Sequence, residues 1–179
     1  MVGVDQSISS AAAMEAAGEA LGRIVEPGDV LGLIGDLGAG KTVFVRGLAS
    51  GLGVPCSTRV TSPSFVVINE YQGGRLPLLH VDLYRLDEES ELDEIGMDDV
   101  YREEAVIAVE WIDRFPGRSP GDFLEIRIAL SGSNAGERRL ETRAHGIRSL
   151  KLEGAWKQSL TAAGDAVESE HRTREVDES

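Results

Sequence analysis

The sequence predicts a three-layer α/β fold around a mainly parallel central sheet. Short apolar runs without polar alternation, at residues 30–34 and 105–110, are typical of strands that are buried on both faces of a parallel sheet. Segments with helical spacing of apolar residues flank these runs, as in folds whose helices cover a sheet. The 179 residues, 41% of them hydrophobic, are enough for one such domain with a single core.

The charge and the single cysteine narrow the class of function. A formal net charge of −13 would repel a phosphate backbone, so we do not expect this chain to bind nucleic acid by itself. Cys56 cannot form an internal disulfide, and we expect a buried or half-buried thiol. No basic leader precedes an apolar core, and no apolar run approaches the roughly 18 residues of a membrane span. We therefore expect a soluble, cytoplasmic protein.

The first part of the chain predicts a helix, a strand and a second helix. Residues 8–25 place apolar side chains among small residues at helical spacing, near serines that can cap a helix. The buried strand at 30–34 follows a Pro-Gly pair. Residues 41–50 predict a helix that ends where Gly51 follows.

The remainder of the chain predicts further strands, an acidic helix and a tail. The strands are expected at residues 66–71, 76–83, 105–110, 123–130 and 140–144, the last two forming a C-terminal antiparallel hairpin. The acidic stretch at 87–94 predicts a solvated helix. Because apolar periodicity is lost after about residue 152, we expect the domain to cover 1–152 and an acidic, disordered tail to cover 153–179. Trp156 and Leu160 leave open one docking helix before that tail.

The strongest functional signal is the pattern G-x-x-x-x-G-K-[ST], which is met by Gly35, Gly40, Lys41 and Thr42 between a strand and a helix. In such a loop, glycines let the backbone curl so that successive N–H groups face phosphate oxygens. Lys41 would reach the β- and γ-phosphates, and the Thr42 hydroxyl would ligate Mg²⁺. This context predicts a P-loop NTPase-like fold, and the lack of an Asn-Lys-x-Asp run favours ATP over GTP.

Two predicted strands end in acidic residues, Asp82 and Glu110. In an open parallel sheet the carboxyl ends of the strands border the ligand crevice, so both carboxylates can lie near the γ-phosphate and the metal. One carboxylate can hold Mg²⁺ while the other orients the attacking water. The alternative is that each is an ordinary acid at a strand end, making a cap or a salt bridge.

Several neighbouring polar residues have two interpretations. Thr61 and Ser62 either supply a hydroxyl to the γ-phosphate or metal, or form a simple turn. Tyr84 and Arg85 either face the site or a partner, or Arg85 pairs with the acidic helix. His80 lies inside an apolar strand, where a core histidine with satisfied hydrogen bonds is expected.

Four motifs follow one another within about residues 8 to 145. They are Gly35-Asp36-Leu37-Gly38-Ala39-Gly40-Lys41-Thr42, Thr61-Ser62-Pro63-Ser64-Phe65, His80-Val81-Asp82-Leu83-Tyr84-Arg85-Leu86 and Glu110-Trp111. Together they closely resemble the TsaE (YjeE) family of bacterial ATPases. Members of that family are implicated in forming threonylcarbamoyladenosine in tRNA with the partner proteins TsaB and TsaD. Ser64 departs from the family pattern, which more often has threonine there.

The resemblance implies a specific set of site residues. The implied ATP contacts are Asp36, Leu37, Gly38, Ala39, Gly40, Lys41 and Thr42. Thr42 and Glu110 would hold Mg²⁺, and Lys41, Asp82 and Glu110 would be catalytic. By the same resemblance, Arg139 corresponds to a basic residue near the nucleotide in the C-terminal hairpin, with a surface arginine as the alternative.

Three functions remain in competition. The leading hypothesis is an ATPase subunit of a tRNA-modifying assembly, which meets tRNA only indirectly through TsaD and TsaB. The main alternative is a P-loop small-molecule kinase, for which Arg114 and Arg118 are the candidates for an arginine lid. A third hypothesis is a nucleotide-gated binding module whose hydrolysis is too slow to matter.

Overall fold

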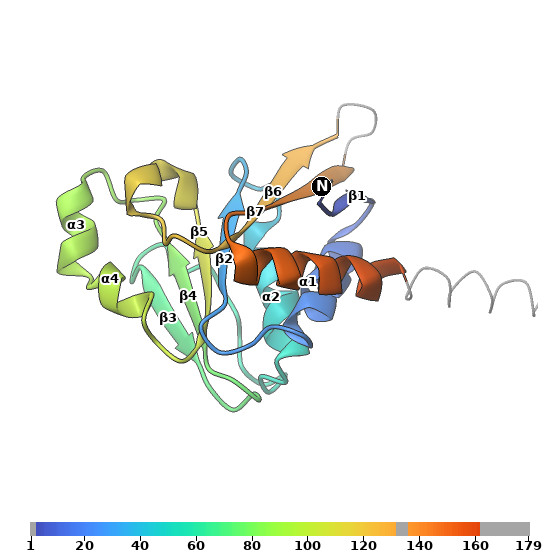
Figure 1. Cartoon of the computed structure of the whole chain (residues 1–179), viewed down its shortest axis with the longest axis horizontal. Coiled ribbons are helices and arrows are strands. Elements are labelled where there is room, and N and C mark those ends of the chain that lie inside the picture. The colour runs from blue at the N-terminus through green and yellow to red at the C-terminus, as the bar shows by residue number, and fades with distance from the viewer. Residues whose placement is uncertain (1–2, 132–135, 162–179) are drawn as a thin grey trace, which may run out of the picture.

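The centre of the molecule is a seven-stranded sheet (Figure 1), seen in a computed structural model that describes residues 3–131 and 136–161. The strands are β1 (Asp5–Ile8), β2 (Val30–Ile34), β3 (Ile68–Tyr71), β4 (Leu78–Asp82), β5 (Val106–Glu110), β6 (Leu124–Leu130) and β7 (Arg138–Ala144). Their order across the sheet is β1-β7-β6-β2-β5-β4-β3. Strands β6, β2, β5 and β4 pair in parallel, while β3, β7 and β1 pair antiparallel at the two edges.

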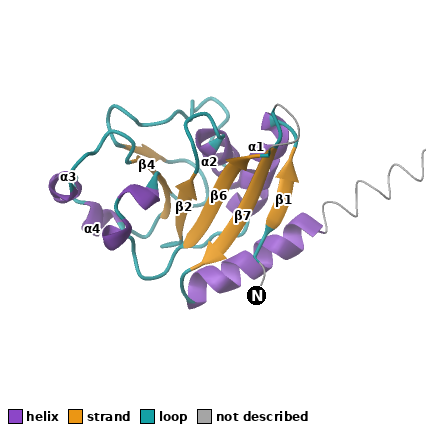
Figure 2. Ribbon diagram, turned by 90° about the horizontal axis from the view of Figure 1, so that it is seen from above, coloured by secondary structure: helices purple, strands orange, loops and turns teal. Residues whose placement is uncertain are grey.

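Helices cover both faces of this sheet and make three layers (Figure 2). The elements are α1 (Ala11–Gly22), α2 (Lys41–Gly51), α3 (Glu89–Glu94), α4 (Met97–Val100), the 3₁₀ turns η1 (Ile112–Arg114) and η2 (Pro116–Arg118), and a helix at residues 147–161. One core lies between the sheet and α1, α2 and the last helix, and a second core lies under α3, α4 and the 3₁₀ turns. Within the described part of the chain, no helix is long and apolar enough to cross a membrane.

The burial of each strand follows from its place in these layers. All residues of β2 and β5 are buried, because both faces of the sheet centre are covered. In β6 the side chains of Leu124, Ile126 and Ile128 are buried while Arg127 is exposed, because only one face is covered there. The predicted mixed sheet, parallel in its centre and antiparallel at the C-terminal hairpin, is confirmed.

Helices α1 and α2 cross at backbone contact through glycines. A Cβ atom added at Gly47 would lie 2.0 Å from the Glu15 carbonyl oxygen, and one added at Gly18 would lie 2.2 Å from the Phe44 carbonyl oxygen. Gly22 and Gly51 are equally close to the opposite helix. Because α2 begins at the glycine-rich loop, this close crossing sets where the loop meets its helix.

The helix at residues 147–161 belongs to the domain. The Trp156 side chain is fully buried, its Nε1 donates a hydrogen bond to the Ala17 carbonyl oxygen at 3.2 Å, and its ring lies edge-on to that of Phe44. The domain thus continues past the predicted boundary at residue 152, at least to 161. Residues 162–179 of the predicted tail lie outside the described residues.

Two local expectations are wrong. Residue Ile8 lies in β1, not in the first helix, and the Ser10 hydroxyl caps α1 by accepting a hydrogen bond from the Ala13 amide at 3.1 Å. Strand β1 forms by pairing with β7, a partner far along the chain that no local pattern reveals. Cys56 is exposed, not buried, because it lies in the loop after α2.

Replacing Gly47 with alanine should destabilise the protein, although alanine usually stabilises a helix relative to glycine. The new methyl group would clash with the backbone of α1, so we expect a loss of about 2 kcal/mol in the free energy of unfolding. The matched control is Gly154→Ala in the last helix, where nothing lies within 4 Å of the added atom and a gain of about 1 kcal/mol is expected. Urea unfolding measures both changes, and equal gains would contradict the close crossing.

Candidate nucleotide site

The loop between β2 and α2 curls through backbone conformations that suit glycine. Gly38 and Gly40 have φ angles of 80° and 117°, and Gly35 at 153° could carry no Cβ, since that atom would lie 2.2 Å from the Ile128 carbonyl oxygen. Gly40 is the N-cap of α2 and offers no side chain to cap it. The first amides of α2 therefore keep no side-chain partner at this cap, which is the arrangement that favours anion binding at a helix N-terminus.

Lys41 holds this loop closed on itself. Only 4% of its surface is exposed, and its Nζ donates to the carbonyl oxygens of Gly35 at 2.5 Å and Asp36 at 3.0 Å. Nζ also lies 3.7 Å from the centre of the Trp111 ring. Burial lowers the pKa of Lys41, and the nearby carboxylates of Glu110 and Asp82 oppose that shift.

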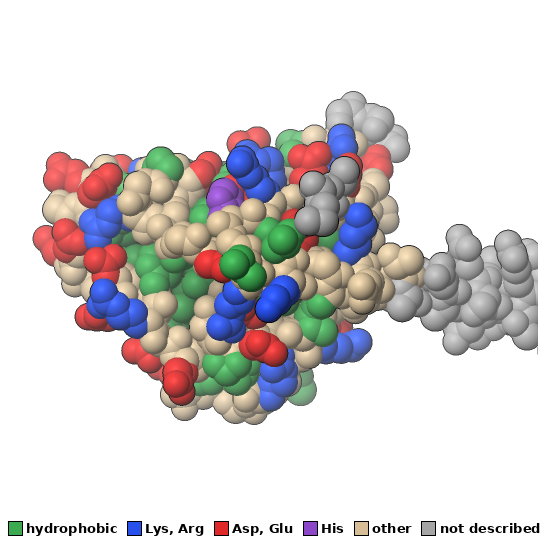
Figure 3. Space-filling model, viewed as in Figure 1, with side chains coloured by type: hydrophobic (Ala, Val, Ile, Leu, Met, Phe, Trp, Pro, Cys, Tyr) green, Lys and Arg blue, Asp and Glu red, His purple; other side chains and the backbone are tan. Residues whose placement is uncertain are grey.

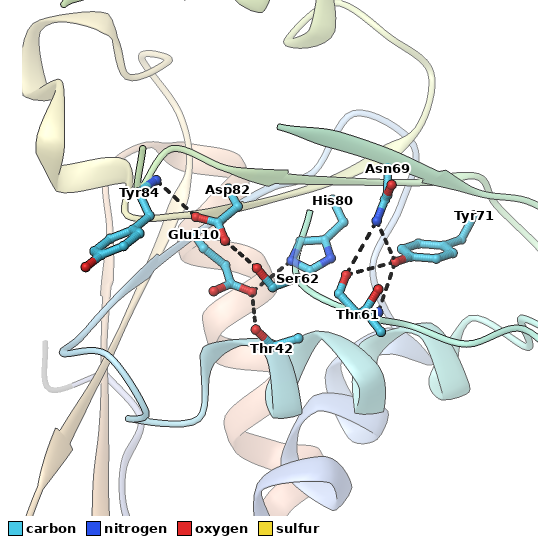
Figure 4. Close-up of polar contacts among 9 residues, drawn as sticks. All are labelled: Thr42, Thr61, Ser62, Asn69, Tyr71, His80, Asp82, Tyr84 and Glu110. Atoms are coloured by element: carbon cyan, nitrogen blue, oxygen red, sulfur yellow. Dashed lines mark hydrogen bonds and ion pairs between the residues drawn. The ribbon is translucent and has the colours of Figure 1, made fainter. Parts of the chain in front are cut away.

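Glu110 at the end of β5 joins the loop helix to the sheet (Figure 4). The residue is 3% exposed, and its Oε1 accepts a hydrogen bond from the Thr42 hydroxyl at 2.8 Å. The same oxygen lies 2.8 Å from Nε2 of His80, a fully buried residue of β4. A carboxylate this deeply buried requires donors or a positive charge around it.

Asp82 lies directly opposite Glu110, because β4 and β5 pair in parallel with these residues in register. Its Oδ2 accepts the Ser62 hydroxyl at 2.5 Å, and its Oδ1 accepts the Tyr84 amide at 3.0 Å. The expectation that both strand-end acids meet at one edge of the sheet is confirmed. The Ser62 hydroxyl thus faces the site.

The segment leading to β3 is anchored on both sides. The Tyr71 hydroxyl donates to the Thr61 carbonyl oxygen at 3.1 Å and accepts from the Thr61 amide at 3.2 Å. The Asp82 amide donates to the carbonyl oxygen of Val67 at 2.9 Å. Among residues 3–131 and 136–161, Val67 and Trp111 are the non-glycine residues with positive φ, 65° and 62°, and both flank the site. Such strained backbone persists where the surrounding structure imposes it, often at functional sites.

These side chains surround one pocket of about 400 Å³, within the range usual for small-molecule sites. Its lining is Leu37, Gly38, Gly40, Lys41, Thr42, Val43, Ser62, Ser64, Asp82, Tyr84, Arg85, Glu110 and Trp111. A hollow of about 180 Å³ adjoins the other side of the loop and includes Ser10, Met14 and Arg138. A larger cavity of about 590 Å³, beside Arg46 and Arg59, is lined by Thr61 but by none of the glycine-rich loop, Asp82 or Glu110.

The arginine predicted in the C-terminal hairpin makes no hydrogen bond to the glycine-rich loop in the described structure. Arg139 is exposed and pairs with Asp5 and Glu141, away from the loop. Its neighbour Arg138 instead reaches the loop, where Nε donates to the Ala39 carbonyl oxygen at 3.1 Å. Successive side chains of a strand point to opposite faces, and Arg138 shares the face of the buried Leu140. The alternation of faces along the strand could therefore have identified Arg138 from the sequence.

Three further arginines that the sequence singled out differ in where they lie. Arg85 lines the pocket and lies over the exposed Phe65 ring at 4.0 Å, and within the described part of the chain it forms no ion pair with the acidic helix. Arg114 donates to the Leu86 carbonyl oxygen at 2.6 Å, and Arg118 pairs with Asp93 at 2.6 Å. Figure 3 shows acidic and basic side chains interleaved over this α3 and α4 region.

The donor set fits magnesium. Among the described residues, no group of three or more His, Cys, Asp and Glu could hold a metal ion. Mg²⁺ needs no such cage, because it keeps water and substrate phosphates as ligands and takes only one or two from the protein. Thr42 Oγ1 and Glu110 Oε1, 2.8 Å apart at the pocket, offer a hydroxyl and a buried carboxylate of the hard oxygen type it prefers.

The fold and the site define a P-loop NTPase-like α/β protein, with the glycine-rich loop at the carboxyl end of a central strand. The chain belongs to the TsaE family: the model for "Threonylcarbamoyl adenosine biosynthesis protein TsaE" matches residues 8–140.

Individual relatives agree with this assignment. The tRNA threonylcarbamoyladenosine biosynthesis protein TsaE of Bacillus subtilis (strain 168) is 45% identical over 124 residues, which cover 69% of this chain and 74% of the relative. The protein of the same description from Nostoc sp. (strain PCC 7120) is 40% identical over 68% of this chain and 74% of the relative. The crystal structure of Bacillus subtilis YdiB superimposes with a TM-score of 0.75 at 33% identity, covering 88% of this chain and 97% of that one.

Replacing Arg138 with alanine should loosen the glycine-rich loop, whereas replacing Arg139 should not. Loss of the hydrogen bond to the Ala39 carbonyl oxygen removes about 1 kcal/mol of local stability, or about fivefold in the opening equilibrium. Amide hydrogen exchange of the loop and the start of α2 measures this change. Equal protection in both variants would contradict the assignment of Arg138 to the loop.

Proposed function

We propose that this protein is an ATP-binding and ATP-hydrolysing subunit that acts with TsaB and TsaD in threonylcarbamoyl modification of tRNA. Its family takes part in tRNA threonylcarbamoyladenosine biosynthesis. The observation that carries the finer proposal is the convergence of four side chains on one pocket at the carboxyl ends of β2, β4 and β5. They are Lys41, Thr42, Asp82 and Glu110.

The loop from Asp36 to Thr42 would bind the phosphates. Its backbone amides and the N-terminus of α2 supply hydrogen-bond donors, and Lys41 supplies a positive charge. Lys41 would exchange the carbonyl oxygens of Gly35 and Asp36 for phosphate oxygens. The hollow beside Met14 and Arg138, on the other side of the loop, offers room for the nucleoside.

The two carboxylates have distinct environments, which supports distinct roles. Glu110 contacts Thr42, so this pair would hold Mg²⁺, which supplies charge neutralisation to the phosphates when bound. Asp82 contacts Ser62 of the preceding segment instead, and would accept a hydrogen bond from the attacking water and orient it. The sequence left open which of the two acids orients the water. The proposal gives that role to Asp82 and metal binding to Glu110.

The arginine contacts argue against the kinase alternative. A kinase lid would need free arginines able to close over the phosphates, but Arg114 and Arg118 are bound to the α3 and α4 side of the molecule. The net charge of −13 supports contact with tRNA only through the partner proteins.

Lys41→Ala should abolish or strongly weaken ATP turnover. The loop would lose its fixed positive charge, and we expect the hydrolysis rate to fall about a hundredfold or more. Calorimetry with ATP and Mg²⁺ and a phosphate-release assay measure binding and turnover. Lys151→Ala, which removes an exposed lysine from the last helix, is the matched control. Undiminished turnover in Lys41→Ala would refute the site.

Glu110→Gln separates hydrolysis from binding. The amide keeps the shape of the side chain but lacks the charge that would hold the metal, so ATP hydrolysis should be lost. The assay mixes the variant with TsaB, TsaD, ATP and the modification substrates, and counts rounds of tRNA modification. Wild-type protein should support repeated rounds. Full cycling with the variant would favour a nucleotide-gated module, and full cycling without any of this protein would refute the role.

A further inference from the structure

We propose that His80 is a positioning residue that holds the Glu110 carboxylate in the orientation that binds the metal ion. This inference rests on the proposed nucleotide function and adds a residue to it. The sequence alone favoured a core histidine with satisfied hydrogen bonds. The unequal surroundings of its two ring nitrogens, one paired with Glu110 and one without a partner, point instead to a role at the site.

The imidazole reaches Glu110 from the neighbouring strand. His80 is fully buried on β4, and its Nε2 lies 2.8 Å from Glu110 Oε1. Its register partner on β5 is Ala108, whose small side chain leaves space for the ring to extend diagonally to Glu110, two residues further along the same face. The Tyr71 ring lies on its other side, with ring centres 6.4 Å apart.

The second ring nitrogen is what distinguishes this histidine from an ordinary core residue. Nδ1 is buried and has no hydrogen-bond partner in the described structure. A carboxylate accepts hydrogen bonds, so Nε2 is the nitrogen that donates to Glu110, and Nδ1 is left without a partner. A buried polar atom without a partner costs free energy that an apolar residue here would avoid. The contact of Nε2 with Glu110 is the compensating gain.

The same oxygen of Glu110 has two donors, and they differ in what happens when a metal binds. Figure 4 shows Oε1 between Thr42 and His80, with the second oxygen turned away from both. Thr42 would itself hold Mg²⁺ together with Glu110, so its hydroxyl would be shared between the metal and the carboxylate. His80 would contact the carboxylate alone, as the outer partners of metal ligands do, and would keep it in place.

The test compares two replacements of His80 that differ in one hydrogen-bond donor. Methionine fills a similar volume without a donor, whereas glutamine can place an amide N–H where Nε2 lies. ATP affinity is measured by calorimetry across a Mg²⁺ series and again in EDTA. In His80→Met the Mg²⁺ concentration at half-effect should rise about tenfold. Affinity in EDTA should stay unchanged, and His80→Gln should remain near the wild type.

Two controls separate positioning from a general structural effect. His145→Met breaks a second histidine–glutamate pair, to Glu125 at 2.9 Å, and should leave the Mg²⁺ dependence unchanged. In a Glu110→Gln background, His80→Met should produce no further loss, because a residue that acts through Glu110 has nothing left to position. An additional loss there would overturn the proposal.

The remaining outcomes are also decisive. A wild-type protein that binds no ATP with or without Mg²⁺ would overturn the proposed function together with this inference. Normal wild-type binding with an unchanged Mg²⁺ midpoint in His80→Met would overturn this inference alone, as would an equal loss of affinity in EDTA. If His80→Met does not fold, His80→Asn replaces it, because its shorter amide stops near the Nδ1 position and should lose the same Mg²⁺ dependence.

Discussion

The structure around the loop depends on keeping one buried carboxylate satisfied. Glu110 has almost no access to water, so its charge must be met by protein groups. Thr42 from the loop helix and His80 from the adjacent strand meet on one of its oxygens. Burial lowers the pKa of Lys41, and the charge of Glu110 is close enough to oppose that shift. Strand pairing, the helix start and the loop are therefore coupled through a single side chain.

Two halves of the molecule hold this arrangement in different ways. Under the loop, glycines bring α1 and α2 to backbone contact, and Trp156 closes the same core from the last helix. Such close packing tolerates little movement. On the other face, α3 and α4 are joined to the 3₁₀ turns partly by surface ion pairs, including those of Arg118, and exposed pairs contribute little to stability. The loop is thus supported from its more firmly packed side.

Local patterns predicted the centre of the fold and most of the site. Strand β2, the loop and α2 are contiguous in sequence, and Asp82 and Glu110 meet because both end neighbouring parallel strands. What the patterns missed depends on pairing between distant segments. Strand β1 forms because it pairs with β7, and no local pattern in the sequence identifies β7 as its partner. His80 and Arg138 share strand faces with Asp82 and Leu140, so two-residue alternation could have identified both.

The contacts of Lys41 have a consequence for how tightly any anion can be held. The ammonium group is solvated by two carbonyl oxygens of its own chain. An incoming anion replaces those bonds rather than satisfying a bare charge, so part of the attraction is cancelled by what is given up. The same exchange favours release of the anion, because the ammonium group can then form its hydrogen bonds to the carbonyl oxygens again. A loop built this way holds an anion less tightly and releases it more readily.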